Sequence, residues 1–419
     1  MAAAVPRSDP TPGTPAHDES HGAALRIGVL TETAEGEHRV ALDPTAVAKL
    51  VTAGRIVQLE SGAGAAASFP DAAYLAVGAT IATRAAILAN CQVLAVVRSP
   101  DDTLVAALTK GQTLLGLLDP LNHPDMIRDL TARGVTTVAF EFVPRTISRA
   151  QSMDALSSQS SAAGYRAAIV AAHAYERYLP MMITASGTAT PAKVIVIGAG
   201  VAGLQAIATA RRLGAVVTGY DVRDASRQEV ESLGAKFLTS SVAKGAGAGG
   251  YARVMTDAEK ATQQKELDAA LADFDVIITT AKVPGHAPPE LVSEATLASL
   301  RPGSVCIDLG SSALGGNVAG SVDGTTTVTA GGVTLVGGGE LAADLPTSAS
   351  QMYARNVVAV LDSLAPNGEI VIDSTDAVHQ GIVVAHDGEV SNAAMRAVLK
   401  LDPLPDAAPA PDHTQEKQA

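Results

Sequence analysis

Apolar runs of strand length alternate with amphipathic segments along the first third of the chain. The segment 44–54 repeats its apolar residues at helical spacing and lies between the apolar runs 25–30 and 55–60. Fully apolar strands separated by such helices are typical of parallel strands that are covered on both faces. The first part of the chain is therefore predicted to form an α/β, doubly wound parallel sheet. Further strands of this sheet are expected at 92–97, 113–118 and 135–143.

A second series of the same kind follows a helical stretch at 161–179, with strands expected at 193–198, 276–280 and 304–309. The segment 348–364 has the pattern of a long helix with no strand of the second series beside it. We expect this helix to cross back and pack on the first sheet. The whole pattern predicts two Rossmann-like domains that flank a cleft.

The two ends of the chain have a different character. Residues 1–22 contain prolines among Ser, Thr and acidic residues but no apolar segment, which indicates a disordered leader rather than a targeting signal. Residues 402–419 have a similar composition and are predicted to be a disordered tail. Between them, the first domain is assigned to residues 23–145 plus 345–401, and the second to residues 146–344.

Composition narrows the class of protein. Of the 419 residues, 47% are hydrophobic and 3% aromatic, so the chain has ample material for a core built from small apolar side chains. The formal net charge of −13 argues against a protein that binds nucleic-acid phosphates. No apolar run approaches the ~20 residues needed to span a bilayer. The 2 cysteines, Cys91 and Cys306, lie in apolar runs and suit a reducing compartment.

The sequence GAGVAG directly follows an apolar run and opens an amphipathic helix. In such a motif Gly198 permits a tight turn, Gly200 lets the backbone approach a pyrophosphate, and Gly203 lets helix and strand pack closely. The free amides at the helix N-terminus favour an anion. A glycine-rich turn alone is a weak signal, but here strand, glycines, helix and second strand coincide. We interpret the segment as a dinucleotide site.

The strand after this helix ends at Asp221. A carboxylate at this position accepts hydrogen bonds from the adenosine ribose and repels a 2′-phosphate, which favours NAD over NADP. Arg223 lies close enough in the sequence to weaken that preference. Val201 and Val222 adjoin these positions and complete the predicted nucleotide-binding set.

A polar loop precedes the long helix that joins the two series. It carries Arg145, Arg149, Gln151 and Asp154, and the serines from 157 to 161 are expected to cap the helix. Because Arg and Asp in loops are usually solvated, spacing alone also suits a solvated interdomain linker with a helix cap. Both interpretations are open at this point.

Glycines crowd the start of the segment 244–266, and Tyr251 and a charged helix follow them. This composition suits a mobile flap that closes over a ligand. A surface insertion has the same composition, so the residues alone do not decide between the two.

Several of these segments together resemble the α subunits of proton-translocating NAD(P)+ transhydrogenases, specifically their soluble NAD(H)-binding component. The resemblance runs from about Leu25 to about residue 365. It implies two Rossmann-like domains with a cleft between them, and NAD(H) bound to the second domain with its nicotinamide facing the cleft. The segments that carry it, in order, are RTISRAQSMDALSSQSSAAGYRA, GAGVAGLQAIATARRLGA, GYDVR, ESLGAKF, GGYA, ITTAKVPG and PGSVCIDL.

The resemblance also implies roles for individual residues. Arg145, Gln151, Asp154 and Ser157 match the family's nicotinamide-contacting loop, in which the Arg and Asp hold the nicotinamide end. The Gln of that loop bridges toward the NADP(H) of a partner subunit, so Arg145, Gln151 and Asp154 are the catalytic candidates. Tyr251 matches the tyrosine of the family's mobile loop, which closes over bound nucleotide. No acid or base is required, because hydride passes directly between nicotinamide C4 atoms held ~3–3.5 Å apart.

By the same resemblance, the chain is expected to be a homodimer that works with a membrane-spanning subunit and an NADP-binding β subunit. Nucleic acid is not expected as a partner, because of the negative net charge. The NADP(H) and the proton path would belong to these partners. No apolar span follows residue 365, which resembles the split arrangement with a separate membrane polypeptide. The expected location is cytoplasmic, peripheral on the inner or plasma membrane. Residues 308–317 depart from the family, with Ser and Ala where an acidic residue often lies.

Alanine dehydrogenase shares this fold and a similar opening, here EGEHRVALDP with Arg39. An amino-acid dehydrogenase needs a general acid or base, usually His or Lys. In that family the His follows the strand corresponding to 113–118, where this chain has Leu and Asp, and His123 comes several residues later. We interpret His123 as a surface residue at a helix start, and we expect no metal site. A substrate-level dehydrogenase and a non-catalytic NAD-binding regulator remain the alternatives.

Overall fold

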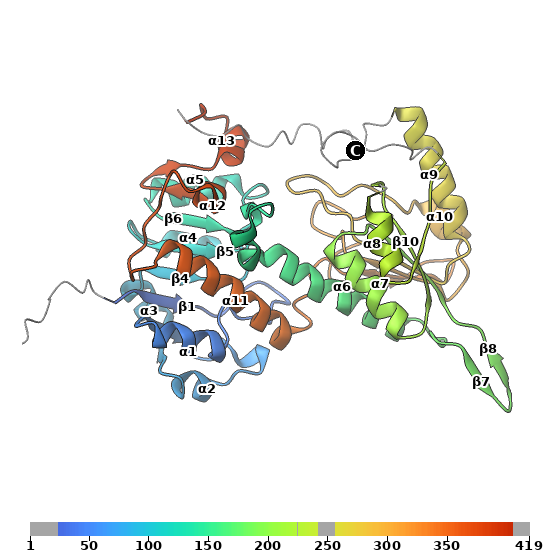
Figure 1. Cartoon of the computed structure of the whole chain (residues 1–419), viewed down its shortest axis with the longest axis horizontal. Coiled ribbons are helices and arrows are strands. Elements are labelled where there is room, and N and C mark those ends of the chain that lie inside the picture. Colours follow the sequence, from blue (N-terminus) through green and yellow to red (C-terminus); the bar gives the residue numbers. More distant parts are fainter. Residues whose placement is uncertain (1–23, 224, 242–255, 405–419) are drawn as a thin grey trace, which may run out of the picture.

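The computed structural model describes residues 24–223, 225–241 and 256–404. Two largely parallel sheets, each covered by helices, form the two halves of the molecule (Figure 1). This is the α/β, doubly wound architecture expected from the sequence. The predicted leader, and all of the predicted tail except residues 402–404, lie outside the described residues.

The first sheet has eight strands in the order β17-β16-β6-β5-β4-β1-β2-β3. Its neighbours are parallel except that β16 runs antiparallel to both β6 and β17. The strands are β1 (Arg26–Val29), β2 (Ile56–Glu60), β3 (Thr80–Ala82), β4 (Val93–Ala95), β5 (Thr113–Gly116), β6 (Thr136–Ala139), β16 (Val383–His386) and β17 (Glu389–Val390). The helices of this half are α1 (Pro44–Thr52), η1 (Ala65–Ala67), α2 (Asp71–Leu75), α3 (Arg84–Asn90), α4 (Asp102–Ala107), α5 (Pro124–Ala132), η2 (Phe140–Phe142), η3 (Ser148–Met153), α11 (Pro346–Leu364), α12 (Ala377–Ile382) and α13 (Ala393–Leu399).

Alternate residues of this sheet enter two separate cores, which explains why its strands are apolar throughout. Val29 and Leu115 belong to the core that α1 and α11 cover, whereas Leu94 and Leu114 belong to the core under α3, α4, α5 and α13. The predicted crossing of the late helix is confirmed. α11 buries Tyr353 completely in the first core, edge-on to Phe140 at a centroid distance of 5.5 Å.

The second sheet has seven strands in the order β11-β10-β9-β12-β13-β15-β14, and all neighbours are parallel except β14 and β15. The helices α7 and α8 cover one face, and α9 and α10 cover the other. The strands are β9 (Lys193–Ile197), β10 (Val216–Tyr220), β11 (Lys236–Phe237), β12 (Val276–Thr279), β13 (Val305–Asp308), β14 (Thr326–Val328) and β15 (Thr334–Gly337). The helices are α7 (Val201–Arg212), α8 (Ser226–Ser232), α9 (Asp257–Leu271) and α10 (Glu294–Ser299).

One long helix, α6 (Ala155–Ala174), joins the two halves (Figure 1). Its first residue, Ala155, is buried in the first core, whereas Ala167 and Ala171 are buried in the second. Because its side chains are mostly small, α6 packs closely on its neighbours. A Cβ added at Gly164 would lie 2.0 Å from the carbonyl oxygen of Ala202 in α7. The same helix therefore fixes the start of α7 relative to the first half.

Some element boundaries differ from those expected. The strand predicted at 135–143 ends at Ala139 and continues as the 3-10 turn η2, where Phe140 turns under α11. The helix predicted at 161–179 begins at Ala155, because Asp154 caps it, and ends at Ala174, because the backbone of Tyr175 is extended. The antiparallel strands β14, β16 and β17 were not expected. All three are short, β14 and β17 are edge strands, and β16 lies between β17 and β6, so each carries a weak sequence pattern.

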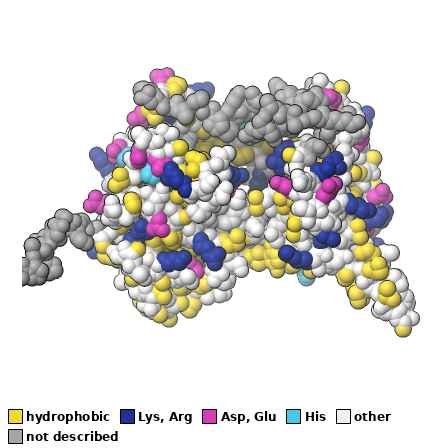
Figure 2. All heavy atoms as spheres, in the orientation of Figure 1, with side chains coloured by type: hydrophobic (Ala, Val, Ile, Leu, Met, Phe, Trp, Pro, Cys, Tyr) yellow, Lys and Arg dark blue, Asp and Glu magenta, His cyan; other side chains and the backbone are white. Residues whose placement is uncertain are grey.

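An antiparallel hairpin of β7 (Met182–Thr184) and β8 (Gly187–Ala189) projects from the second half. In Figure 2 it forms an arm at the lower right that carries several hydrophobic side chains. Its exposed apolar residues are Met181, Met182 and Ile183, and Ile183 is 75% exposed. The hairpin pairs with neither of the two large sheets, so its conformation is set locally.

Candidate functional site

The turn between β9 and α7 has a shape that only glycine allows at two positions. Gly198 has φ +99°, a conformation that side chains of L-residues rarely adopt. A Cβ at Gly203 would lie 1.8 Å from the carbonyl oxygen of Gly198. The hydroxyl of Thr280 donates a hydrogen bond of 3.1 Å to that same oxygen and fixes the turn from the β12 side.

Gly200 has a different role, since it is the N-cap of α7 and has ordinary backbone angles. A Cβ at this position would meet no atom of the described residues within 4 Å. Among these residues no side chain caps α7, so its first amides are available to a ligand. Free amides and the helix dipole make this point attractive to a phosphate. Val201, at the start of the helix, exposes 43% of its surface beside it.

Asp221 follows β10 and lies directly beside the glycine turn. Its carboxylate accepts the N–H groups of Ala199 and Arg223 at 2.8 Å, and the Arg223 guanidinium at 3.0 Å. Burial would raise the pKa of Asp221, but the hydrogen bonds from Arg223 and Ala199 outweigh burial and lower it. Asp221 is therefore ionised at neutral pH, and Arg223 covers it. Val222 between them is 46% exposed.

A cavity of about 400 Å³ adjoins this strand and is lined by Tyr220, Leu238, Gln263 and Leu267, among others. Within the described residues, the buried Nε2 of Gln263 has no hydrogen-bond partner. A buried amide without a partner suits a ligand that brings an acceptor. Sequence reasoning missed Gln263, because a glutamine in a charged helix carries no motif. A larger cavity of about 490 Å³ lies at the amino ends of β4 and β5, away from the predicted site residues.

Four residues were predicted to contact the nicotinamide, and three of them, Arg145, Asp154 and Ser157, lie together at the start of α6. Asp154 is the N-cap of α6 and accepts the N–H of Ser157 at 2.9 Å and its hydroxyl at 2.6 Å. Arg145 Nε lies 3.3 Å from the Asp154 carboxylate. The expectation that the serines from 157 to 161 cap the helix is wrong. Asp154 caps it, because the helix begins at Ala155 and Ser157 already lies within its first turn.

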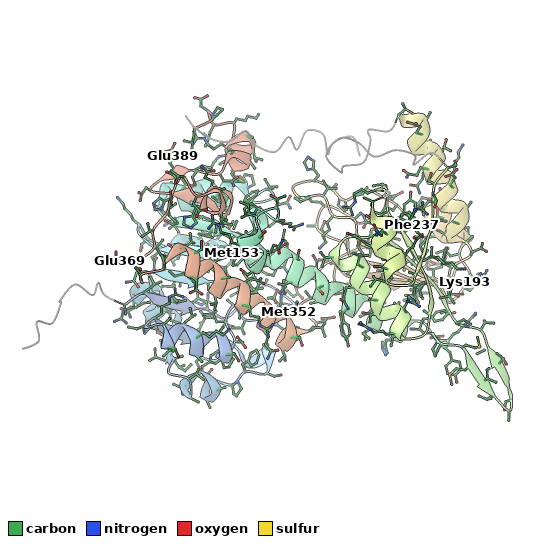
Figure 3. All side chains as sticks on the ribbon, viewed as in Figure 1. Met153, Lys193, Phe237, Met352, Glu369 and Glu389 are labelled. Atoms are coloured by element: carbon green, nitrogen blue, oxygen red, sulfur yellow. The ribbon has the colours of Figure 1, made fainter. Side chains whose placement is uncertain are left out.

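Gln151 is the fourth residue of the set, and its side chain is exposed. It belongs to the 3-10 turn η3, whose Ala150 and Met153 are buried in the first core. Figure 3 labels Met153 where η3 meets α6, next to α11. The turn therefore presents Gln151 outward while its underside is anchored.

The residues of the loop before α6 and those of the glycine turn lie beside different points along the helix α6. Asp154 starts α6, and Gly164, ten residues later, contacts Ala202 at the start of α7. Ten helical residues span about 15 Å. An extended dinucleotide has its two bases at opposite ends, so such a separation suits a ligand of this kind. Tyr251, the predicted flap residue, lies outside the described residues.

The segment 308–317, where Ser and Ala stand in place of an expected acidic residue, is a folded part of the second half. Asp308 is fully buried and accepts the hydroxyl of Thr279 at 2.9 Å and the N–H of Val318 at 3.1 Å. Asn317 is also fully buried and binds both backbone groups of Ala281. These two side chains fix the loops at the carboxyl ends of β12 and β13.

The opening segment of the chain buries an ion pair in the first half. Arg39 donates to Glu37 at 2.7 and 2.5 Å and to Gln159 of α6 at 2.9 Å, and lies 3.6 Å from Glu340. Burial would raise the pKa of Glu37, but Arg39 outweighs burial and lowers it. The guanidinium of Arg39 is thus occupied by groups of this chain.

His123 is the N-cap of α5, and its side chain is half exposed. It lies 3.9 Å from Asp119 on the surface, as expected for a residue at a helix start. In the described parts of the chain, His, Cys, Asp and Glu side chains form no group that could hold a metal ion. The helices described also include none that is long and apolar enough to cross a membrane.

Comparisons with known proteins give a consistent result. The profile of the alanine dehydrogenase/PNT N-terminal domain matches residues 28–163, and that of the C-terminal domain matches residues 167–393. An NAD(P) transhydrogenase alpha-subunit protein of Rhodospirillum rubrum is 42% identical over 385 residues, which cover 88% of this chain and 99% of that protein. Alanine dehydrogenase of Mycobacterium tuberculosis is 31% identical over 295 residues, covering 68% of this chain and 72% of that protein. The crystal structure of transhydrogenase from Sinorhizobium meliloti superposes with a TM-score of 0.78 at 40% identity, covering 87% of this chain and 99% of that one.

Proposed function

The chain belongs to the alanine dehydrogenase/PNT family and, within it, to the NAD(P) transhydrogenase alpha subunits, and from this premise we propose that it is the NAD(H)-binding subunit. In this role it passes hydride directly between NADH and NADP+ held by a partner subunit, and a membrane subunit couples the transfer to proton movement. The observation that carries the proposal is one helix, α6. It begins at the Asp154 loop and packs on the start of α7 beside the glycine turn.

The residues of the second half fit a dinucleotide. The first amides of α7 take the pyrophosphate, with Gly200 leaving room for its approach. Asp221 accepts hydrogen bonds from the adenosine ribose hydroxyls. For this, the Arg223 guanidinium has to release part of its hydrogen bonding to the Asp221 carboxylate. Val222 and the cavity beside Gln263 suit the adenine. Bound NAD(H) supplies the hydride at its nicotinamide.

The loop before α6 orients the reacting end. Asp154 is held by Ser157 and Arg145, so its carboxylate has one defined position from which it and Arg145 can bind the nicotinamide end. Gln151 points outward from an anchored turn, where it can reach a second nucleotide on a partner. Direct hydride transfer needs position and exclusion of water rather than an acid or base. The transfer therefore requires no proton step at a titratable side chain of this chain.

Partner subunits follow from the proposed reaction, because the described part of this chain holds one glycine turn of this kind and the second nucleotide needs its own site. We place the chain on the cytoplasmic face of the membrane, attached through these partners.

The homodimer is supported by the projecting hairpin, whose Ile183 is exposed, and by the neighbouring residues Met181 and Tyr178, which are exposed as well. Light scattering tests it, since Ile183→Asp should yield monomers. We assign the domain boundaries near residues 145 and 345, where the loop that leads into α6 begins and where α11 re-enters the first half.

The second candidate is an alanine dehydrogenase-like enzyme, favoured by the shared family and the EHRVALDP opening. Such an enzyme needs a cation to hold its carboxylate substrate. Arg39 is fully engaged by Glu37 and Gln159, and no His lies where β5 ends. The occupied Arg39 argues against this activity.

One experiment separates the candidates. The chain is mixed with an NADP-binding β subunit, and hydride transfer between NADH and an NADP analogue is followed by stopped-flow absorbance. Transfer that requires both nucleotides supports the proposal. Oxidation of NADH by pyruvate and ammonia alone would replace it with the dehydrogenase, and NADH binding without any transfer would leave a regulator.

A further inference from the structure

The turn that carries Gln151 is tied to the segment that follows α11. Arg149, two residues before Gln151, forms an ion pair with the carboxylate of Asp376. The same carboxylate accepts the N–H of Val378 at 2.7 Å and so caps α12. Asp376 is 227 residues away from Arg149 in the chain, so this contact is a tertiary one.

The same segment also packs where the loop leaves the sheet. β16, which follows α12 directly, pairs with β6, the strand from which the loop emerges. A Cβ at Gly381 would lie 2.8 Å from the carbonyl oxygen of Phe142 and 3.0 Å from Cδ of Pro144. The segment therefore contacts both the root of the loop and the turn η3.

A second element, α11, also contacts η3. The Nδ2 of Asn356 in α11 donates a hydrogen bond of 2.8 Å to the carbonyl oxygen of Ser152. The Oδ1 of Asn356 accepts a hydrogen bond of 2.8 Å from the Ser158 hydroxyl. Figure 3 shows Met153, which follows Ser152, between the start of α6 and α11. Gln151 thus lies between Arg149 and Ser152, each of which is fixed by a different part of the fold.

We propose that Asp376 is a positioning residue, which sets the direction of Gln151 by holding Arg149 at the start of the same turn. A six-residue 3-10 turn has too few internal hydrogen bonds to keep one shape alone, so external contacts decide it. This inference rests on the proposed function for its effect on the reaction. The hydrogen bond from Arg149 lowers the pKa of Asp376, so the carboxylate keeps its charge at neutral pH.

The test uses Asp376→Asn in the full chain, because Asn is also a good N-cap and should keep α12 in place. Hydrogen–deuterium exchange is measured for peptides covering 144–154, without nucleotide. We expect exchange there to be at least about threefold faster, with little change elsewhere. In the mixture with the β subunit, hydride transfer should fall about tenfold, while the NADH dissociation constant stays within about threefold. Asp125→Asn, which breaks the surface pair with Arg128, is the control and should change neither.

Arg149→Met provides the second variant, because it removes the same contact from the other side and leaves the cap of α12 intact. It should reproduce both changes, and the double variant should be no worse than either single one. Unchanged exchange in 144–154 in both variants would overturn the proposal, as would faster exchange across the whole first half. If the wild-type mixture transfers no hydride, the proposed function fails, whereas the exchange result still decides whether Asp376 holds the loop.

Discussion

The two ends of the candidate site are built in different ways. The glycine turn takes most of its shape from backbone geometry within six residues, through Gly198 at positive φ and Gly203 against its carbonyl, and Asp221 and Thr280 each add one hydrogen bond. The Gln151 loop takes its shape from side chains whose partners, Asn356 and Asp376, lie 204 and 227 residues further along the chain. Binding therefore rests on a local structure, and the orientation of the reacting end rests on the tertiary fold.

Breaking the turn should have the largest effect. Gly203→Ala places a Cβ 1.8 Å from the Gly198 oxygen, which cannot move without distorting β9. We expect a loss of stability of about 1–3 kcal/mol and at least about a hundredfold weaker NADH binding. Calorimetry and NADH titration measure the two.

Gly200→Ala is the matched control for this substitution. Its Cβ points into open space at ordinary backbone angles, so thermal stability should stay unchanged while NADH binding weakens. If Gly200→Ala binds NADH as wild type does, the pyrophosphate does not approach this turn.

The next largest effect concerns the choice of nucleotide. Asp221→Asn removes the negative charge but keeps an acceptor, and it frees Arg223 from its ion pair. We expect the preference for NADH over NADPH to shrink about tenfold, because a 2′-phosphate is no longer repelled. Titration with both nucleotides measures this, and a wild type that binds them equally well would show that Asp221 does not select.

A smaller effect is expected from a carboxyl group at the root of the loop. Burial raises the pKa of Glu141 from 4.5 to about 7 although the N–H of Asp119 opposes this, and Glu32 nearby in the same half is raised similarly. The unfolded chain then loses these protons first, so stability falls as pH rises from about 4.5 to about 7 and levels off above. Glu141→Gln should reduce that slope and stabilise the protein by about 1 kcal/mol at pH 8. Melting temperatures of both proteins are measured between pH 5 and 8. If they change with pH in the same way in the wild type and in Glu141→Gln, the result contradicts this prediction.

The smallest effect separates two roles of Asp154. Asp154→Ala removes the cap of α6 and should cost about 1 kcal/mol, whereas Asp154→Asn keeps the cap and should cost only a few tenths. Both lose the ion pair with Arg145, which is largely exposed and contributes little to stability. Urea unfolding compares the variants, and equal losses would mean that capping is not what Asp154 contributes.

The same contrast explains what could be predicted from the sequence. The alternating pattern, Gly198, Gly203 and Asp221 are local signals, and the architecture and the return of α11 onto the first sheet were predicted from such signals. The cap at Asp154 was misassigned because Ser157 is an equally good cap by type and only geometry decides between them. The contacts of Asn356 and Asp376, and the amide of Gln263 that has no partner among the described residues, have no sequence pattern, since each depends on which distant segment packs beside it.

The division between binding and orientation is the central claim, and one substitution tests it most directly. For Gln151→Asn, the NADH dissociation constant and the rate of hydride transfer to a partner-bound NADP analogue are measured on the same mixture. We expect a dissociation constant within a few-fold of wild type and a transfer rate lower by one to three orders of magnitude, because a misplacement of about 1 Å can cost ~100-fold. Near-normal transfer with a collapse of NADH affinity would make Gln151 an ordinary binding residue and contradict this division.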